Sequence, residues 1–152
     1  MFKECHPVSP RRKKLEILCG LPPEGPPPRL MLVSEPQSVH AARRWVREFV
    51  ESRLPATSGA RAADIELVVS ELVTNGIRYG SEPGDSVLVV LDVRPALVRV
   101  EVHDPVRRRP RGRAVSHQRA RGRGLFIVAA LAERWGVEDR PFGKSVWAEL
   151  AR

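Results

Sequence analysis

One stretch decides the fold predicted for this chain: Glu71-Leu72-Val73-Thr74-Asn75-Gly76. It lies late in a segment whose apolar residues recur at spacings of three and four, which predicts a helix over residues 62–79 that ends at Gly80. The apolar stripe consists of Ile65, Val68, Val69, Leu72, Val73 and Ile77. Glu71 and Asn75 are four residues apart, so they project from one side of the helix, at the edge of this stripe.

A carboxylate and an amide in this arrangement suit a magnesium-bound nucleotide. The amide oxygen of Asn75 can complete the octahedral oxygen shell of Mg²⁺. The carboxylate of Glu71 can accept a proton from an attacking hydroxyl or water. The pair alone also fits a solvated helix edge without any chemical role, so the interpretation depends on what faces it.

A second informative segment is Gly122-Arg123-Gly124-Leu125, at the start of a helix predicted to run to about Trp135. Glycines there let backbone N–H groups approach phosphates closely, where the helix dipole favours anions. A glycine pair before a helix is common and is not specific by itself. The dinucleotide fingerprint is excluded, because its third glycine would fall at Ile127. A P-loop ending at Gly143-Lys144-Ser145 is excluded too, because its first glycine would fall at Glu138 and a strand follows.

The rest of the chain predicts one more helix and several strands. The helix begins with Ser38 as its cap and carries apolar residues at helical spacing to Val50. The strands are expected over residues 29–33, 86–93, 97–102, 136–138 and 145–150, with 94–96 as a tight hairpin. We therefore expect an α+β fold, a two-layer sandwich with a mixed, mostly antiparallel sheet and helices on one face.

The first 28 residues differ in composition from the remainder. They hold seven of the fourteen prolines and the basic cluster Arg11-Arg12-Lys13-Lys14, which predicts a disordered arm over residues 1–28. Residues 29–152 then form a single domain. No apolar run approaches the ~20 residues that span a bilayer, and the chain does not begin with an apolar signal-peptide core. We expect a cytoplasmic protein with no membrane contact.

Most of the positive charge is confined to one segment. The formal net charge is +8, and eight arginines against the single Asp104 place +7 of it between residues 104 and 123. They are Arg107, Arg108, Arg109, Arg111, Arg113, Arg119, Arg121 and Arg123. Their mutual repulsion suggests a lid that orders around an anion, while a protein-docking surface, a nucleic-acid contact and plain solvated disorder stay open. Nucleic acid is the least favoured partner, because its backbone usually requires a wider basic face.

Asp104 closes the strand predicted over residues 97–102 and precedes Pro105. An aspartate at a strand end is usually a turn former. Its carboxylate can instead accept a hydrogen bond from an exocyclic amine such as that of adenine, and the residue alone does not distinguish the two roles.

Together these segments resemble the histidine-kinase-like ATPase superfamily and, more narrowly, the small serine-kinase anti-sigma factors and their actinobacterial relatives. Residues 71–80 resemble the N box of that family, and residues 100–104 resemble its first glycine-box region. Residues 122–136 resemble the second glycine box, and residues 143–150 resemble the closing strand. The likeness follows the family's order over residues 30–152, and it implies a Bergerat-type ATP-binding fold with ATP and Mg²⁺ as ligands.

The resemblance also implies roles for individual residues. Asn75 would ligate Mg²⁺, and Glu71 would be the general base of phosphoryl transfer. Asp104 would read the adenine amino group, with Ser145 assisting through water.

At the phosphate end of the ligand, the resemblance implies a hinged lid. Gly122 and Gly124 would form the hinge, and Arg121 or Arg123 would reach the γ-phosphate.

The resemblance further implies protein partners, a sigma factor and an anti-sigma antagonist of the STAS type, whose serine would be phosphorylated. The alternative is a non-catalytic module that binds nucleotide, or nothing, and sequesters a partner. That alternative is favoured by one departure from the family, since Pro105-Val106-Arg107 stands where a glycine is common two residues after Asp104. The sequence leaves open whether the chain forms a homodimer.

Overall fold

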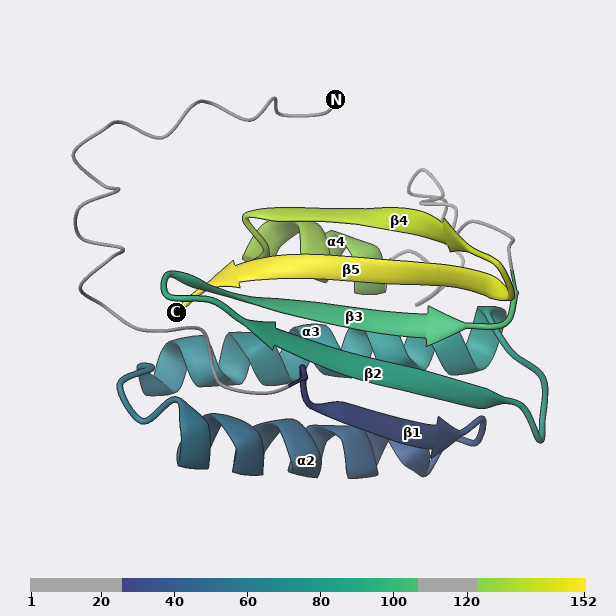
Figure 1. Ribbon diagram of the computed structural model, residues 1–152, viewed down its shortest axis with the longest axis horizontal. Coiled ribbons are helices and arrows are strands. Elements are labelled where there is room, and N and C mark those ends of the chain that lie inside the picture. The colour runs from purple at the N-terminus through teal and green to yellow at the C-terminus, as the bar shows by residue number, and fades with distance from the viewer. Residues whose placement is uncertain (1–25, 107–122) are drawn as a thin grey trace.

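The computed structural model describes residues 26–106 and 123–152. The predicted arm, most of the arginine-rich segment, Arg121 and Gly122 therefore lie outside the described residues. The described residues form two layers, a sheet and a set of helices (Figure 1).

The sheet has five strands in the order β1-β2-β3-β5-β4 within the described residues. Their bounds are β1 Arg29–Val33, β2 Ser86–Val93, β3 Leu97–Asp104, β4 Arg134–Arg140 and β5 Gly143–Ala151. Every neighbouring pair is antiparallel. The predicted α+β class is thus confirmed, but the sheet is antiparallel throughout these strands and not mixed.

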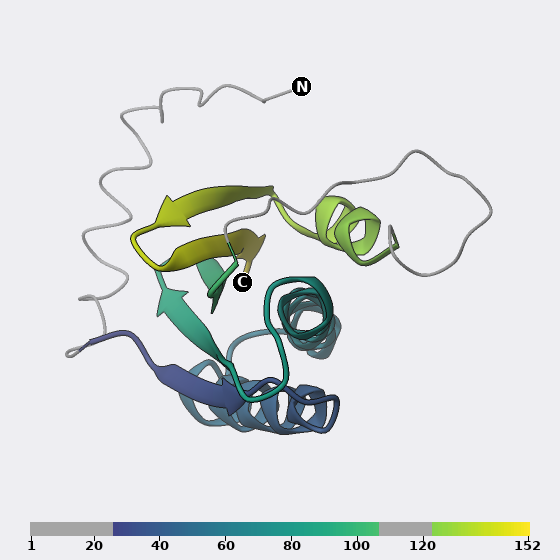
Figure 2. The same ribbon diagram turned by 90° about the vertical axis from the view of Figure 1, so that its right-hand side faces the viewer.

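Three helices cover one face of the sheet in the described part of the chain (Figure 2). They are α2 Ser38–Arg53, α3 Gly59–Tyr79 and α4 Arg123–Leu131. Helix α3 is central, because it packs against α2, α4 and strands β2, β3 and β5. No helix in residues 26–106 and 123–152 combines the length and apolar character that crossing a bilayer demands.

The core lies between α3 and the middle strands. Val98, Val100 and Val102 of β3 point toward the helices and are at most 1% exposed, as expected for alternate residues of a half-buried strand. Helix α3 approaches the sheet closely at Gly76. A Cβ built on Gly76 would lie 3.3 Å from Val102 Cγ1 and 3.4 Å from Val87 Cγ1. This contact fixes the height of the second half of α3 above β2 and β3.

Both long helices start differently from the prediction. Ser58 caps α3, because its side chain accepts a hydrogen bond from the backbone N–H of Arg61 at 3.3 Å, so the helix begins three residues before the expected Ala62. Ser38 was expected to cap α2, but its hydroxyl donates to the Val33 carbonyl oxygen at 2.7 Å and Gln37 occupies the cap position. The hydroxyl therefore ties the start of α2 to the end of β1.

The prediction for α4 was wrong at its end. The helix ends at Leu131 and not near Trp135, and β4 begins at Arg134 instead of residue 136. The edge of β5 explains the difference, because Trp135 pairs with Ala148 and the backbone N–H of Glu133 donates to the Glu149 carbonyl oxygen at 2.8 Å. Pairing with a strand has overridden the local helical pattern.

Candidate functional site

The polar pair at the edge of α3 is positioned by the packing of that helix. Leu72 and Val73 are buried against the sheet, which leaves Glu71 and Asn75 half-buried at its side. Neither side chain makes a hydrogen bond or ion pair with any residue in the described ranges. A carboxylate and an amide without protein partners are therefore available to a ligand.

The start of α4 lies directly against this pair. A Cβ built on Gly124 would lie 2.7 Å from Glu71 Oε2 and 3.4 to 3.5 Å from the two terminal atoms of the Asn75 amide. A side chain at position 124 would thus press on both groups, so glycine allows the α4 backbone to approach them. The structure brings the Asn75 turn and the second predicted glycine segment together at Gly124.

The α4 helix is held in place by its buried face. Leu125 and Val128 are buried, and Val128 belongs to the main core. Arg123 is the first residue of α4 and is exposed to solvent. Of the predicted phosphate-binding residues, Arg123 and Gly124 thus stand at the helix start beside Glu71, while Arg121 and Gly122 lie outside the described residues.

The carboxylate of Asp104 lies beneath the end of the same helix. Asp104 is the last residue of β3, and its carboxylate fills the space left by the absent side chain of Gly80. Gly80 comes nine residues after Glu71, so the two positions are about 14 Å apart along the helix axis at 1.5 Å per residue. The polar pair and Asp104 therefore lie along the same half of α3.

Asp104 forms a buried ion pair. Lys144 Nζ donates to Asp104 Oδ1 at 2.7 Å, and the two side chains are 4% and 2% exposed respectively. Burial raises the pKa of the Asp104 carboxyl, while the ammonium group of Lys144 and the Val106 N–H counteract that rise. The two charges are therefore largely removed from water and depend on each other.

The same pair holds the segment that follows β3. Lys144 Nζ also donates to the Val106 carbonyl oxygen at 2.7 Å. The Val106 N–H lies 3.1 Å from Asp104 Oδ1 and 3.2 Å from the Gly80 carbonyl oxygen. Val106 is thus tied to β3, to β5 and to the end of α3.

Gly143 sets the path by which β5 enters this site. Its φ of +137° lies in a region that L-residues rarely adopt, and a Cβ there would overlap the backbone carbonyl of Asp104. Glycine is therefore required on two grounds, and the start of β5 is pressed against the end of β3.

The structure does not place the predicted site residue Ser145 next to Asp104. Lys144 is the residue paired with Asp104, and Ser145 is paired with His103. Because successive side chains alternate across a strand, Lys144 and Val146 face the helices while Ser145 faces the other side of the sheet. Ser145 is fully buried there, and its hydroxyl has no hydrogen-bond partner among the described residues.

Sequence reasoning missed Lys144, although a signal for it was present. The apolar residues of the closing strand are Val146, Ala148 and Leu150, and they predict that the even-numbered positions face the core. That alternation places residue 144, and not residue 145, on the face of Asp104.

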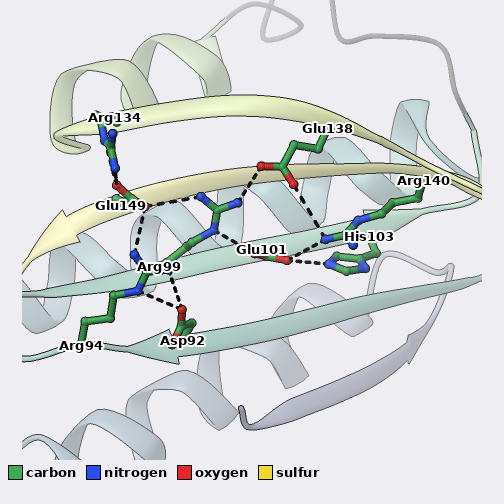
Figure 3. A network of polar contacts seen from close by, with 9 residues as sticks. All are labelled: Asp92, Arg94, Arg99, Glu101, His103, Arg134, Glu138, Arg140 and Glu149. Atoms are coloured by element: carbon green, nitrogen blue, oxygen red, sulfur yellow. Dashed lines mark hydrogen bonds and ion pairs between the residues drawn. The ribbon is translucent and has the colours of Figure 1, made fainter. Parts of the chain in front are cut away.

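The uncovered face of the sheet carries a second, larger set of charges (Figure 3). Arg99 is at its centre and donates to Glu101 Oε1 at 2.8 Å and to Glu138 Oε1 at 3.0 Å. The Arg99 guanidinium also lies 4.0 Å from the ring centroid of Trp147. The full network comprises Asp92, Arg94, Arg99, Glu101, His103, Arg134, Glu138, Arg140 and Glu149. The four arginines and four carboxylates of this network balance each other in charge.

A hollow of about 500 Å³ lies at the opposite end of α3 from Asn75 and Asp104. It is lined by Arg47, Val50, Glu51, Leu54, Pro55, Thr57, Gly59, Ala62, Ala63 and Glu66. The α3 residues in that list all belong to the first half of the helix, so the hollow is separate from the site at Glu71, Asn75 and Asp104.

The donor set beside Gly124 fits a magnesium-bound phosphate. Mg²⁺ prefers oxygen ligands and commonly takes one or two from protein while phosphates and water supply the rest. The Asn75 amide and the Glu71 carboxylate offer such oxygens, and the backbone at the start of α4 lies directly against both groups at Gly124.

The sequence matches the histidine kinase-like ATPase domain over residues 32–150, from β1 to the end of β5. The chain belongs to this family. A search among curated proteins found no significant match. The histidine kinase-like ATPase domain implies ATP as the ligand of the site, typically together with Mg²⁺, and the matched range includes every predicted site residue.

Proposed function

We propose that this histidine kinase-like ATPase domain binds Mg·ATP along the second half of α3 and acts as a serine/threonine kinase of the anti-sigma type. One observation carries the proposal. The backbone of Gly124 lies against Glu71 and Asn75, two oxygen-bearing side chains that have no partner among the described residues.

The proposed reaction transfers the γ-phosphoryl group to a serine hydroxyl of a partner protein. A bond forms between the serine oxygen and the γ-phosphorus, the bond from that phosphorus to the β–γ bridging oxygen breaks, and ADP leaves. Glu71 orients the hydroxyl and accepts its proton. Such transfer needs positioning and charge stabilisation more than covalent help.

The remaining groups hold the triphosphate. The Asn75 amide oxygen would hold Mg²⁺, which supplies positive charge to the phosphates when it is bound. Backbone N–H groups at the start of α4, where Arg123 is the first residue, would bind the phosphates together with the Arg123 guanidinium. In this proposal Arg121 and Gly122 complete the phosphate contacts.

The partners proposed are a sigma factor and a STAS-type antagonist in the cytoplasm, and their support is the resemblance of the site segments to anti-sigma kinases. The runner-up function is a non-catalytic module that sequesters a partner. It is favoured by the Asp104 carboxylate, which Lys144 and Val106 already occupy.

Two variants test the kinase proposal with labelled ATP and a STAS-type protein. Glu71→Ala should lower the transfer rate by about 10²- to 10⁴-fold, the contribution typical of a general base, and leave Mg·ATP affinity nearly unchanged. Asn75→Ala should weaken Mg·ATP binding in calorimetry. Glu48→Ala, on the exposed side of α2, is the matched control and should change neither quantity.

The results distinguish the two functions. Normal phosphorylation by the Glu71→Ala variant would remove Glu71 from catalysis. Tight Mg·ATP binding with no transfer by the wild-type protein would favour the sequestering module. Unchanged affinity in the Asn75→Ala variant would remove Asn75 from the site.

A further inference from the structure

The carboxylate expected to receive the adenine amine is already engaged inside the protein. Asp104 Oδ1 accepts from Lys144 Nζ at 2.7 Å and from the Val106 N–H at 3.1 Å. The carboxylate also fills the space beside Gly80, where a Cβ would overlap it. An amine from a nucleotide base therefore meets a carboxylate whose surroundings are occupied.

Lys144 is the group that a base can displace. The Asp104 carboxylate is contacted by the backbone at Gly80 and at the Val106 N–H, and these groups move little. Lys144 instead reaches Asp104 through a flexible four-carbon side chain. Its ammonium group uses two of its three protons, one on Asp104 Oδ1 and one on the Val106 carbonyl oxygen. Both bonds are lost together when the side chain rotates away.

We propose that Lys144 is a built-in competitor for the base-binding carboxylate, so that a purine base binds Asp104 only when Lys144 leaves Asp104 Oδ1. This inference rests on the proposed function, because it assumes that Asp104 receives the base. Lys144 is accordingly a residue that sets nucleotide affinity.

The competition has a second consequence for the segment after β3. When Lys144 leaves Asp104, the Val106 carbonyl oxygen loses its hydrogen bond from Nζ. Entry of the base is thus coupled to a loosening of residues 105–106, where the chain continues from the sheet.

The first test compares Mg·ATP affinities by calorimetry. Lys144→Met keeps an unbranched side chain as far as the ε carbon and removes the ammonium group, and it should tighten binding about tenfold or more, as expected when the competent form is populated a tenth of the time or less in the wild type. Lys144→Arg retains a cation and should bind like the wild type. Arg44→Met, which removes an exposed charge on α2, controls for the change in net charge.

The outcomes separate this inference from the function on which it rests. Equal or weaker binding by a folded Lys144→Met variant overturns the competition while leaving nucleotide binding in place. No binding by either folded protein overturns the proposed function and the inference together. Circular dichroism confirms folding in each case.

A second test uses the wild-type protein and so does not depend on a variant that folds. Lys144 is 3% exposed and its ammonium is paired, so acetylation by a trace of acetic anhydride should be slow. A non-hydrolysable ATP analogue with Mg²⁺ should raise its acetylation several-fold, measured by mass spectrometry against Lys3, Lys13 and Lys14 as internal references. Unchanged or reduced reactivity of Lys144 at saturating analogue overturns the proposal.

Discussion

The two faces of the sheet both carry ion pairs, and they differ in exposure to water. On the uncovered face, Arg94, Arg134 and Arg140 at the edge of the network are 50%, 47% and 42% exposed, although Arg99 and Glu149 at its centre are 13% and 3% exposed. Pairs with such an exposed arginine typically contribute between 0 and about 1 kcal/mol each. On the helix face, Asp104 and Lys144 are almost completely buried. Burial costs several kcal/mol per ion, and the loss of one partner leaves that cost uncompensated.

The comparison shows that the face with more charges is not the face that carries the candidate site. The uncovered face has nine polar residues in one network, and they satisfy one another. On the helix face, the buried pair of Asp104 and Lys144 lies beside the half of α3 that carries Glu71 and Asn75. A ligand that replaces one partner of a buried pair has a large energetic effect, whereas exposed pairs can exchange partners with water.

The largest effect on stability is expected when the buried pair on the helix face is broken, and a pair on the uncovered face is broken for comparison. Asp104→Ala should destabilise the protein by about 3–5 kcal/mol, because Lys144 becomes a buried charge without its counter-ion. Asp92→Ala removes a carboxylate from the uncovered face and should cost less than about 1 kcal/mol. Urea unfolding measures both, and similar losses for the two variants would show that burial does not separate the two faces.

A smaller effect is expected at the glycine that makes room for Asp104. Gly80→Ala should cost about 1–3 kcal/mol, because its Cβ would overlap the carboxylate and the crowded backbone allows little movement. Gly59→Ala is the matched control, since a Cβ at the start of α3 meets nothing within 4 Å. The control should be neutral or slightly stabilising in thermal unfolding. Equal stability of the two variants would contradict the tight fit around Asp104.

The smallest effect concerns pH on the uncovered face. Burial alone would raise the pKa of Glu101, but hydrogen bonds from Arg99 and His103 outweigh it and lower the pKa below its ordinary value. Glu101 therefore contributes stability above the ordinary glutamate pKa of 4.5, and this contribution is lost as the pH falls through the lowered pKa. Glu101→Gln should cost about 1 kcal/mol at pH 7, the typical net value of a hydrogen bond, and less near pH 3.

The pH dependence of stability expected from Asp104 has the opposite sign to that expected from Glu101. Its pKa is raised by burial, so stability should decrease as the pH rises from the ordinary aspartate pKa of 3.8 through the raised value. Urea titrations of the wild type and the Glu101→Gln variant between pH 3 and 7 measure the Glu101 contribution. A loss from Glu101→Gln that grows as the pH falls would contradict the lowered pKa.

The sequence predicted the main features of the fold because local patterns and tertiary packing agree there. The apolar stripe of α3 identified the core side of the helix and hence the position of Glu71 and Asn75 at its edge. At the end of α4 the local pattern and the tertiary packing disagree, because Trp135 pairs with β5 as part of a strand. A helical period cannot reveal that a strand edge elsewhere in the chain needs a partner.

The site was predicted less completely than the fold, because its groups come from different elements. Contact between Gly124 and Glu71 could be expected only through the family resemblance, since the two residues are far apart in sequence. The pairing of Asp104 with Lys144 depends on the register of β3 and β5, and the sequence patterns specify that register only through side-chain alternation. The roles of all the predicted site residues, Arg121 and Gly122 included, stay predictions.

The backbone at Gly143 makes position 144 a convenient place for engineering. Because the main chain there is confined by its positive φ and by the carbonyl of Asp104, the direction in which residue 144 projects is set before its side chain is chosen. Substitutions at this position thus change the group presented to the carboxylate without redirecting the strand. A panel of amino acids at position 144 would therefore present a graded series of side-chain groups to the Asp104 carboxylate from one fixed backbone position.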